Sequence, residues 1–324
     1  MRVSRLLIIL CGILLGCIGL SRAQTADCLE RTLIVNVTGG AFQPTDLSRE
    51  NFQVIYRGHS LTPESAYYTE GPRRVMVLVD VSGSMNDRGN FAKWKIARLA
   101  ALDLVNTLPP KSKVGLITIA TKNKTQFSLS TDRQVISDWL EREETRGPDV
   151  LGGRTALYDA IEAALTQLQP YEPGDAIYVI GDGGENASKS RRSKVEEALR
   201  ESQVRLFTLI LPPNATYASA EEVAGGRELA SLSRSSGGFV KTLGFPPGLR
   251  IVNEQVKQEI RLHTVRLALQ ISAFYSLRLK LPENPEKARH WEVTVVDSGR
   301  RQKNASVDYP HEIPACHIPV AQQY

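Results

Sequence analysis

The most constraining feature of the sequence is the apolar run from Arg74 to Val81, Arg-Val-Met-Val-Leu-Val-Asp-Val. A strand with one face in water alternates apolar and polar residues, whereas a continuous apolar run predicts a strand that is buried on both faces. Such strands occur in parallel sheets with helices on either side. The run therefore predicts an α/β sheet at the centre of the fold.

Strand-like and helix-like segments alternate after this run. We expect helices over 91–108, 133–141, 155–168, 193–202 and 220–234, and strands over 114–120, 176–180, 205–211 and 238–242. This alternation, with short connections, predicts a Rossmann-like α/β domain whose central sheet is mostly parallel and is covered by helices on both faces.

The segments that flank this region are rich in predicted strands. Strand-like pieces span 32–37 and 51–56 before it and 273–281, 290–297 and 305–308 after it, and a helix-like stretch spans 249–267. A cluster of Pro and Gly at 244–248 marks the edge between them. We divide the chain into a signal peptide (1–23), an N-terminal β-rich segment (24–72), the α/β domain (73–245) and a C-terminal helix and β-rich segment (246–324).

The first residues predict export. Residues 1–5 include Arg2 and Arg5 and no acidic residue, and residues 6–20 form an apolar run of 15 residues, which is shorter than the roughly 20 that a membrane span needs. A small residue at Ala23 predicts cleavage before Gln24, which would give a secreted or periplasmic protein with no transmembrane span in its mature chain. Two alternatives stay open, namely a retained membrane anchor and a lipid attached to Cys17.

The net charge of the chain, +5 from 40 Lys and Arg against 35 Asp and Glu, gives little support for a polyanionic partner. Three of the arginines lie in the signal segment, which has no acidic residue, so the mature chain has a net charge of +2. We therefore expect no nucleic-acid binding.

The mature chain keeps two cysteines, Cys28 near its start and Cys316 near its end. Exported proteins meet oxidants, and two cysteines permit one bridge, so we predict a disulfide between them; two unpaired thiols are the alternative. Such a bridge would bring both flanks together into one small β-rich domain, with the α/β domain inserted in it. The sequence has no Cys-x-x-Cys and no His-Glu-x-x-His, so a zinc or redox site is not predicted.

Oxygen-bearing side chains occur where parallel sheets bind ligands, beyond the carboxyl ends of the strands. Asp80, Ser82 and Ser84 end or follow the apolar strand, Thr155 stands at the start of a predicted helix, and Asp182 follows a later strand. Two carboxylates and three hydroxyls, without nitrogen or sulfur, suit a hard divalent cation such as Mg²⁺, with Mn²⁺ or Ca²⁺ as alternatives. The simpler interpretation is helix capping by the hydroxyls and solvated loop positions for the aspartates.

The order of these segments resembles that of a von Willebrand factor A (VWA) domain. Asp-Val-Ser-Gly-Ser (80–84), Gly-Gly-Arg-Thr (152–155) and Gly-Asp-Gly (181–183) match its metal-ion-dependent adhesion site, and the resemblance covers 73–245. Where the family often has Thr-Asp-Gly, this chain has Gly181, so a hydroxyl beside the second aspartate is missing.

The resemblance also implies roles for the five residues. Ser82 and Ser84 would bind the metal directly, Thr155 directly or through water, and Asp80 and Asp182 through bound waters. One coordination position would be left for a carboxylate of a protein ligand, which implies a non-enzymatic, adhesion-type binding module. A structural or assembly component of the cell envelope, in which the metal only stabilises the loops, is the alternative. An enzyme is disfavoured because no nucleophile–base pair is visible.

The flanks carry a finer resemblance. It rests on residues 45–52, on 233–239, on the Phe274-Tyr275 strand and on the segment Trp-Glu-Val-Thr-Val at 291–295. This layout is similar to that of exported bacterial VWFA-related proteins of the type abundant in Acidobacteria. It implies an architecture rather than a more specific function.

Overall fold

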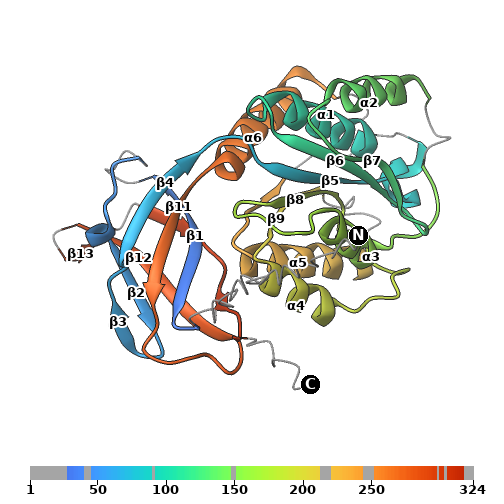
Figure 1. Ribbon diagram of the computed structural model, residues 1–324. Coiled ribbons are helices and arrows are strands. Elements are labelled where there is room, and N and C mark those ends of the chain that lie inside the picture. The colour runs from blue at the N-terminus through green and yellow to red at the C-terminus, as the bar shows by residue number, and fades with distance from the viewer. Residues whose placement is uncertain are drawn as a thin grey trace, which may run out of the picture.

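A computed structural model describes residues 28–39, 45–89, 92–146, 151–211, 220–243, 252–297, 299–302 and 305–316. Its described part contains an α/β domain and a smaller β domain (Figure 1). The predicted signal segment, with Cys17 and the cleavage position at Ala23 and Gln24, lies outside the described residues.

The α/β domain is built on a six-stranded sheet in the order β10-β9-β8-β5-β6-β7. Its strands are β10 (Val240–Thr242), β9 (Arg205–Ile210), β8 (Ala176–Gly181), β5 (Arg74–Asp80), β6 (Lys113–Ile119) and β7 (Lys124–Ser130). All neighbouring pairs are parallel except β6 and β7, which are antiparallel. The predicted fold class, with a mostly parallel sheet, is therefore confirmed.

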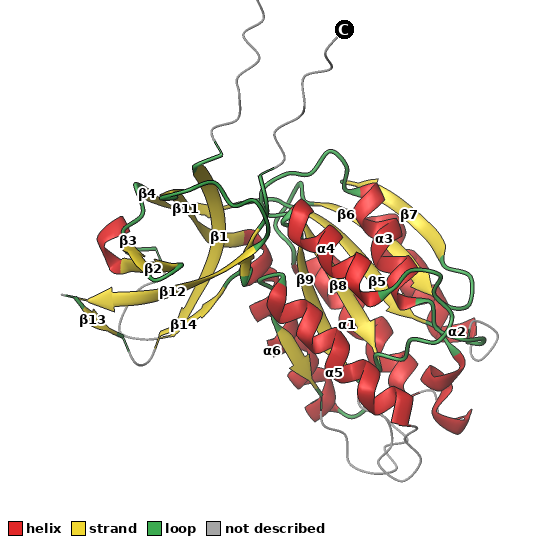
Figure 2. Cartoon of the chain, turned by 90° about the horizontal axis from the view of Figure 1, so that it is seen from below, coloured by secondary structure: helices red, strands yellow, loops and turns green. Residues whose placement is uncertain are grey.

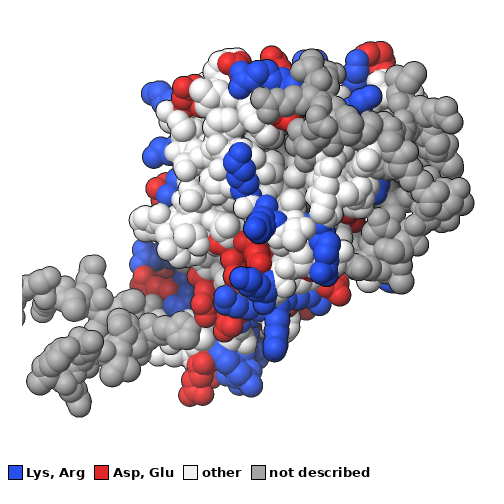
Figure 3. All heavy atoms as spheres, turned by 90° about the vertical axis from the view of Figure 1, so that its right-hand side faces the viewer, with Lys and Arg blue, Asp and Glu red and all other residues white. Residues whose placement is uncertain are grey.

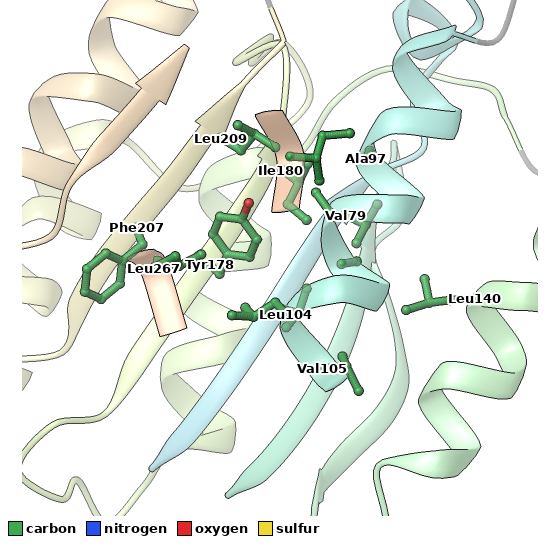
Figure 4. Packing of buried hydrophobic residues seen from close by; sticks show 14 of the residues in the cluster. Val79, Ala97, Leu104, Val105, Leu140, Tyr178, Ile180, Phe207, Leu209 and Leu267 are labelled. Carbon is green, nitrogen blue, oxygen red and sulfur yellow. The ribbon is translucent and has the colours of Figure 1, made fainter. Parts of the chain in front are cut away.

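Helices cover both faces of this sheet because the side chains of β5 alternate between two apolar cores. Val75, Val77 and Val79 pack on one face, and Met76 and Leu78 on the other. The first face is covered by α1 (Ala92–Thr107), α2 (Gln134–Arg146) and α6 (Glu254–Ser272). The second is covered by α3 (Leu157–Gln167), α4 (Arg192–Ser202) and α5 (Ala220–Ser235). Figure 4 shows the first core, in which Leu104 of α1 and Tyr178 of β8 lie between the sheet and its helices.

Three helices differ most from the prediction, and one of them, expected over 133–141, runs on to Arg146. The helix expected over 155–168 begins at Leu157, because both backbone groups of Thr155 bond to the loop that contains Asn186. The helix expected over 249–267 runs from Glu254 to Ser272 and passes directly into β11, the next strand. It packs beside α1 in the core of the α/β domain.

The β domain is made from both flanks of the chain. One antiparallel sheet has the order β14 (Ala305–Asp308), β1 (Glu30–Gly39), β11 (Ala273–Lys280) and β4 (Ser65–Glu70). The other contains β13 (Arg300–Arg301), β12 (Arg289–Asp297), β2 (Phe52–Tyr56) and β3 (His59–Leu61), and β15 (Glu312–Ile313) also pairs with β12. Apolar side chains of both sheets form one core. A disulfide joins Cys28 to Cys316, whose Cα atoms are 5.7 Å apart, as predicted.

The two domains lie side by side, with α6 at their junction (Figure 2). The guanidinium of Arg205, on β9, is buried there and donates to Asn36 Oδ1 at 2.8 Å and to the carbonyls of Gln270 and Ile271 at 2.9 and 3.0 Å. These two carbonyls belong to the last turn of α6, where helix carbonyls lack partners within the helix. One buried cation therefore links β9, α6 and β1.

Candidate metal site

Three loops meet at the carboxyl edge of the central sheet. The first loop (80–84) starts at the last residue of β5, the second (151–156) precedes α3, and the third (181–187) starts at the last residue of β8. Because β5 and β8 are parallel neighbours with Val79 opposite Ile180, the residues that follow them reach the same edge. Gly181 permits this approach, since a Cβ atom there would lie 2.8 Å from Cβ of Asp80.

Hydrogen bonds donated by backbone N–H groups hold the three loops to one another. Gly83 N–H donates to the carbonyl of Gly153 at 3.0 Å, and Gly152 N–H donates to that of Val81 at 2.9 Å. The second and third loops are joined by Thr155 N–H, which donates to Asn186 Oδ1 at 2.9 Å, and by the N–H of Asn186, which donates back to the Thr155 carbonyl at 3.0 Å. The protein itself therefore fixes the relative positions of the loops.

All five oxygen-bearing residues of the sequence pattern lie on these loops. The Oγ atoms of Ser82 and Ser84 are 3.1 Å apart, and Ser82 N–H donates to Asp80 Oδ1 at 2.7 Å. A Cβ atom on Gly184 would lie 3.4 Å from Asp182 Oδ1 and 3.5 Å from Thr155 Oγ1, so these two oxygens border the same small space. Asp80, Ser82, Thr155 and Asp182 are buried, and Ser84 is partly exposed.

The two carboxylates of the site are buried, which makes their ionisation costly. Burial, and then the negative charge of Asp182, raise the pKa of Asp80 to about 7. Two carboxylates buried at one edge need a cation or a proton, since an uncompensated buried charge is costly. This need, with an oxygen-only donor set, fits a hard divalent cation.

Hydroxyls are essential to that fit. Within the described ranges, no three His, Cys, Asp or Glu side chains group as a metal cluster would. A cation at this edge would therefore depend on Ser82, Ser84 and Thr155 as well as on the two aspartates.

Sequence reasoning missed a sixth residue, Lys93. It lies in the first turn of α1, and its Nζ is 2.9 Å from Asp182 Oδ2, with the two side chains 7% and 0% exposed. A signal was present, because Lys93, Ala97 and Ala100 share one apolar helix stripe on which a charged residue is unusual.

On the face in Figure 3, where atoms are described, basic and acidic side chains are interspersed rather than separated by sign. Among the described helices, none combines the length and the apolar character needed to cross a bilayer.

The fold and this loop arrangement define an α/β domain with a candidate cation site, and part of that domain matches a known family model. Residues 75–185 match the family model of the von Willebrand factor type A domain. The chain therefore contains a VWA domain, a module generally used for protein interaction. The match ends at residue 185, within the α/β domain and before β9, and no curated protein sequence matches this chain.

Several solved structures are similar to this chain. An aerotolerance-related membrane protein from Bacteroides fragilis is 21% identical, with 61% of this chain and 98% of that chain covered and a TM-score of 0.45. BatB from Bacteroides thetaiotaomicron is 21% identical, with coverages of 60% and 98% and a TM-score of 0.44. A von Willebrand factor type A protein from Catenulispora acidiphila is 11% identical, with coverages of 87% and 73% and a TM-score of 0.45. At these identities and TM-scores the likeness carries no conclusion about what this chain binds or does.

Proposed function

We propose that this protein is an exported, non-enzymatic module that binds a protein partner through a divalent cation, Mg²⁺ in the first instance. The observation that carries the proposal is the meeting of three hydroxyls and two buried carboxylates on three connected loops at the carboxyl edge of the sheet. Ser82, Ser84 and Thr155 would hold the ion together with Asp80 and Asp182. When bound, the cation would offer its open side to an acidic side chain of the partner.

The exposure of the residues supports a binding role. Ser84 is the partly exposed member of the set, while both aspartates are buried. Positive charge from the ion would therefore be accessible at the surface, and the negative charges that hold it would not. A carboxylate of the partner gains most in such a setting, because it meets a cation without meeting the buried aspartates.

Export is supported by the disulfide between Cys28 and Cys316, since such bonds persist in oxidising compartments. The basic and apolar residues 1–20 support it further. The proposal includes a secreted or periplasmic location, with cleavage before Gln24.

Isothermal titration with Mg²⁺ tests the metal-binding part of the proposal. The mature chain should bind one Mg²⁺, Asp80→Ala should abolish binding, and Asp132→Ala, which removes an exposed carboxylate on a distant turn, should leave it unchanged. Circular dichroism of each variant would verify that the fold is retained. Equal Mg²⁺ binding by the wild-type chain and Asp80→Ala would refute this site.

A second experiment tests the partner-binding part. Immobilised mature chain should capture a partner from the envelope fraction of its host in Mg²⁺ and release it in EDTA, and Asp80→Ala should capture none. If capture is indifferent to EDTA while chelation lowers the melting temperature, the metal only stabilises the loops. The protein would then be a structural or assembly component.

A further inference from the structure

The side chain of Lys93 is a cation that the protein itself places in the candidate metal site. Lys93 is 5% exposed, and its Nζ donates to Asp182 Oδ2 at 2.9 Å. Lysine is almost never buried to this degree unless a partner compensates its charge. The ion pair is therefore the reason that this ammonium can remain inside.

The pair also occupies the carboxylate that a metal would need. Asp182 Oδ1 accepts the N–H of Gly184 at 3.2 Å, and Oδ2 accepts Lys93, so each oxygen already has a donor. A divalent cation, or a water bound to it, would meet a positive charge on the same carboxylate. In a site with little water, two such charges repel each other strongly.

We propose that Lys93 competes with the metal: its ammonium neutralises Asp182 when no metal is bound, and a divalent cation binds by displacing it. This inference rests on the proposed metal binding and adds what sets its strength. Without Lys93 the site would hold two unpaired carboxylates when empty and would bind the cation more tightly. With Lys93, the empty site is stabilised and the metal affinity is reduced.

The size of the effect follows from the bond that the metal must replace. The metal-free protein is stabilised by the hydrogen bond between the charged groups of Lys93 and Asp182. Removing that bond should tighten metal binding by about tenfold to a hundredfold. Lys93→Met removes the charge and keeps much of the side-chain length. Lys95→Met is the matched control, since Lys95 lies on the same helix but is exposed.

Isothermal titration with Mg²⁺ and with Mn²⁺, on the full mature chain, measures this directly. We expect Lys93→Met to bind about tenfold or more tightly than wild type, and Lys93→Arg and Lys95→Met to show no such gain. Thermal melting should agree: without metal, Lys93→Met melts below wild type, and saturating Mg²⁺ narrows the gap. Equal or weaker binding by Lys93→Met, or an equal gain in Lys95→Met, would overturn the inference.

The design separates this inference from the proposed function. If folded wild type and folded Lys93→Met bind neither ion, metal binding itself is wrong; if both bind equally, only the role of Lys93 is wrong. Should Lys93→Met fail to fold, Lys93→Gln removes the charge but keeps a neutral donor to Asp182, and it should show a smaller gain in the same direction. If both variants fold only with Mg²⁺, the cation replaces the charge of Lys93, as the inference predicts. If they fail to fold even with Mg²⁺, that result contradicts the inference.

Discussion

Replacing Arg205 tests whether one buried cation joins the two domains. Arg205→Met removes three hydrogen bonds of 2.8 to 3.0 Å, to Asn36 and to the carbonyls of Gln270 and Ile271. Each bond to a charged group contributes about 1.5–3 kcal/mol. Release of the guanidinium from its buried position, where burial lowers the pKa of Arg205 to about 9, offsets part of that loss. The three lost bonds, less this offset, lead us to expect a net loss of about 3–5 kcal/mol in the free energy of unfolding.

Urea unfolding at pH 7, followed by circular dichroism with the disulfide intact, gives the number. Arg200→Met is the control, because Arg200 pairs with Glu312 across the same junction at 3.0 Å but is partly exposed. Its loss should not exceed about 1 kcal/mol. If Arg205→Met unfolds within about 1 kcal/mol of wild type, Arg205 does not join the domains in the way described.

Three further predictions concern pH, the disulfide and the loops. Burial lowers the pKa of His263 from 6.5 to about 4, so the unfolded chain binds a proton at a higher pH than the folded chain does. The free energy of unfolding should therefore fall by up to about 3 kcal/mol as pH drops through this range. Urea unfolding at pH 7 and at pH 4.5 should show a smaller fall for His263→Gln than for wild type. Replacing Cys28 and Cys316 by Ser should lower the free energy of unfolding by about 2–5 kcal/mol in the same assay at pH 7. Thiol titration of the denatured mature chain should find neither of these two cysteines free. Gly225→Ala would place a Cβ atom 2.0 Å from a backbone oxygen of the third loop and should weaken Mg²⁺ binding in a titration, whereas Gly152→Ala, with nothing within 4 Å, should not.

The α/β domain could be predicted because its strands are apolar in themselves. The run 74–81 needs no knowledge of its neighbours to be recognised as a buried strand. The strands that were missed lack this property. β7, at the edge of the sheet, has polar residues at most positions, and β4 is defined by its pairing with β11, some two hundred residues later in the chain. Such strands are specified by their partners rather than by their own sequence.

The candidate site divides in the same way. Asp80, Ser82 and Ser84 could be predicted to lie together because they are close in sequence and end a strand. Lys93 could not be assigned to the site, since its partner Asp182 is 89 residues away and the contact depends on how α1 packs against the sheet. The apolar stripe of α1 marks Lys93 as buried, but it does not identify the group that compensates the charge.

The most direct test of the central claim, a divalent cation on the three loops, is an anomalous difference map from crystals grown with Mn²⁺. We predict one peak at the carboxyl edge of the central sheet, within bonding distance of the hydroxyls of Ser82 and Ser84, that disappears in crystals of Asp80→Ala. A map with no peak at this edge, at Mn²⁺ concentrations that saturate binding in solution, would contradict it.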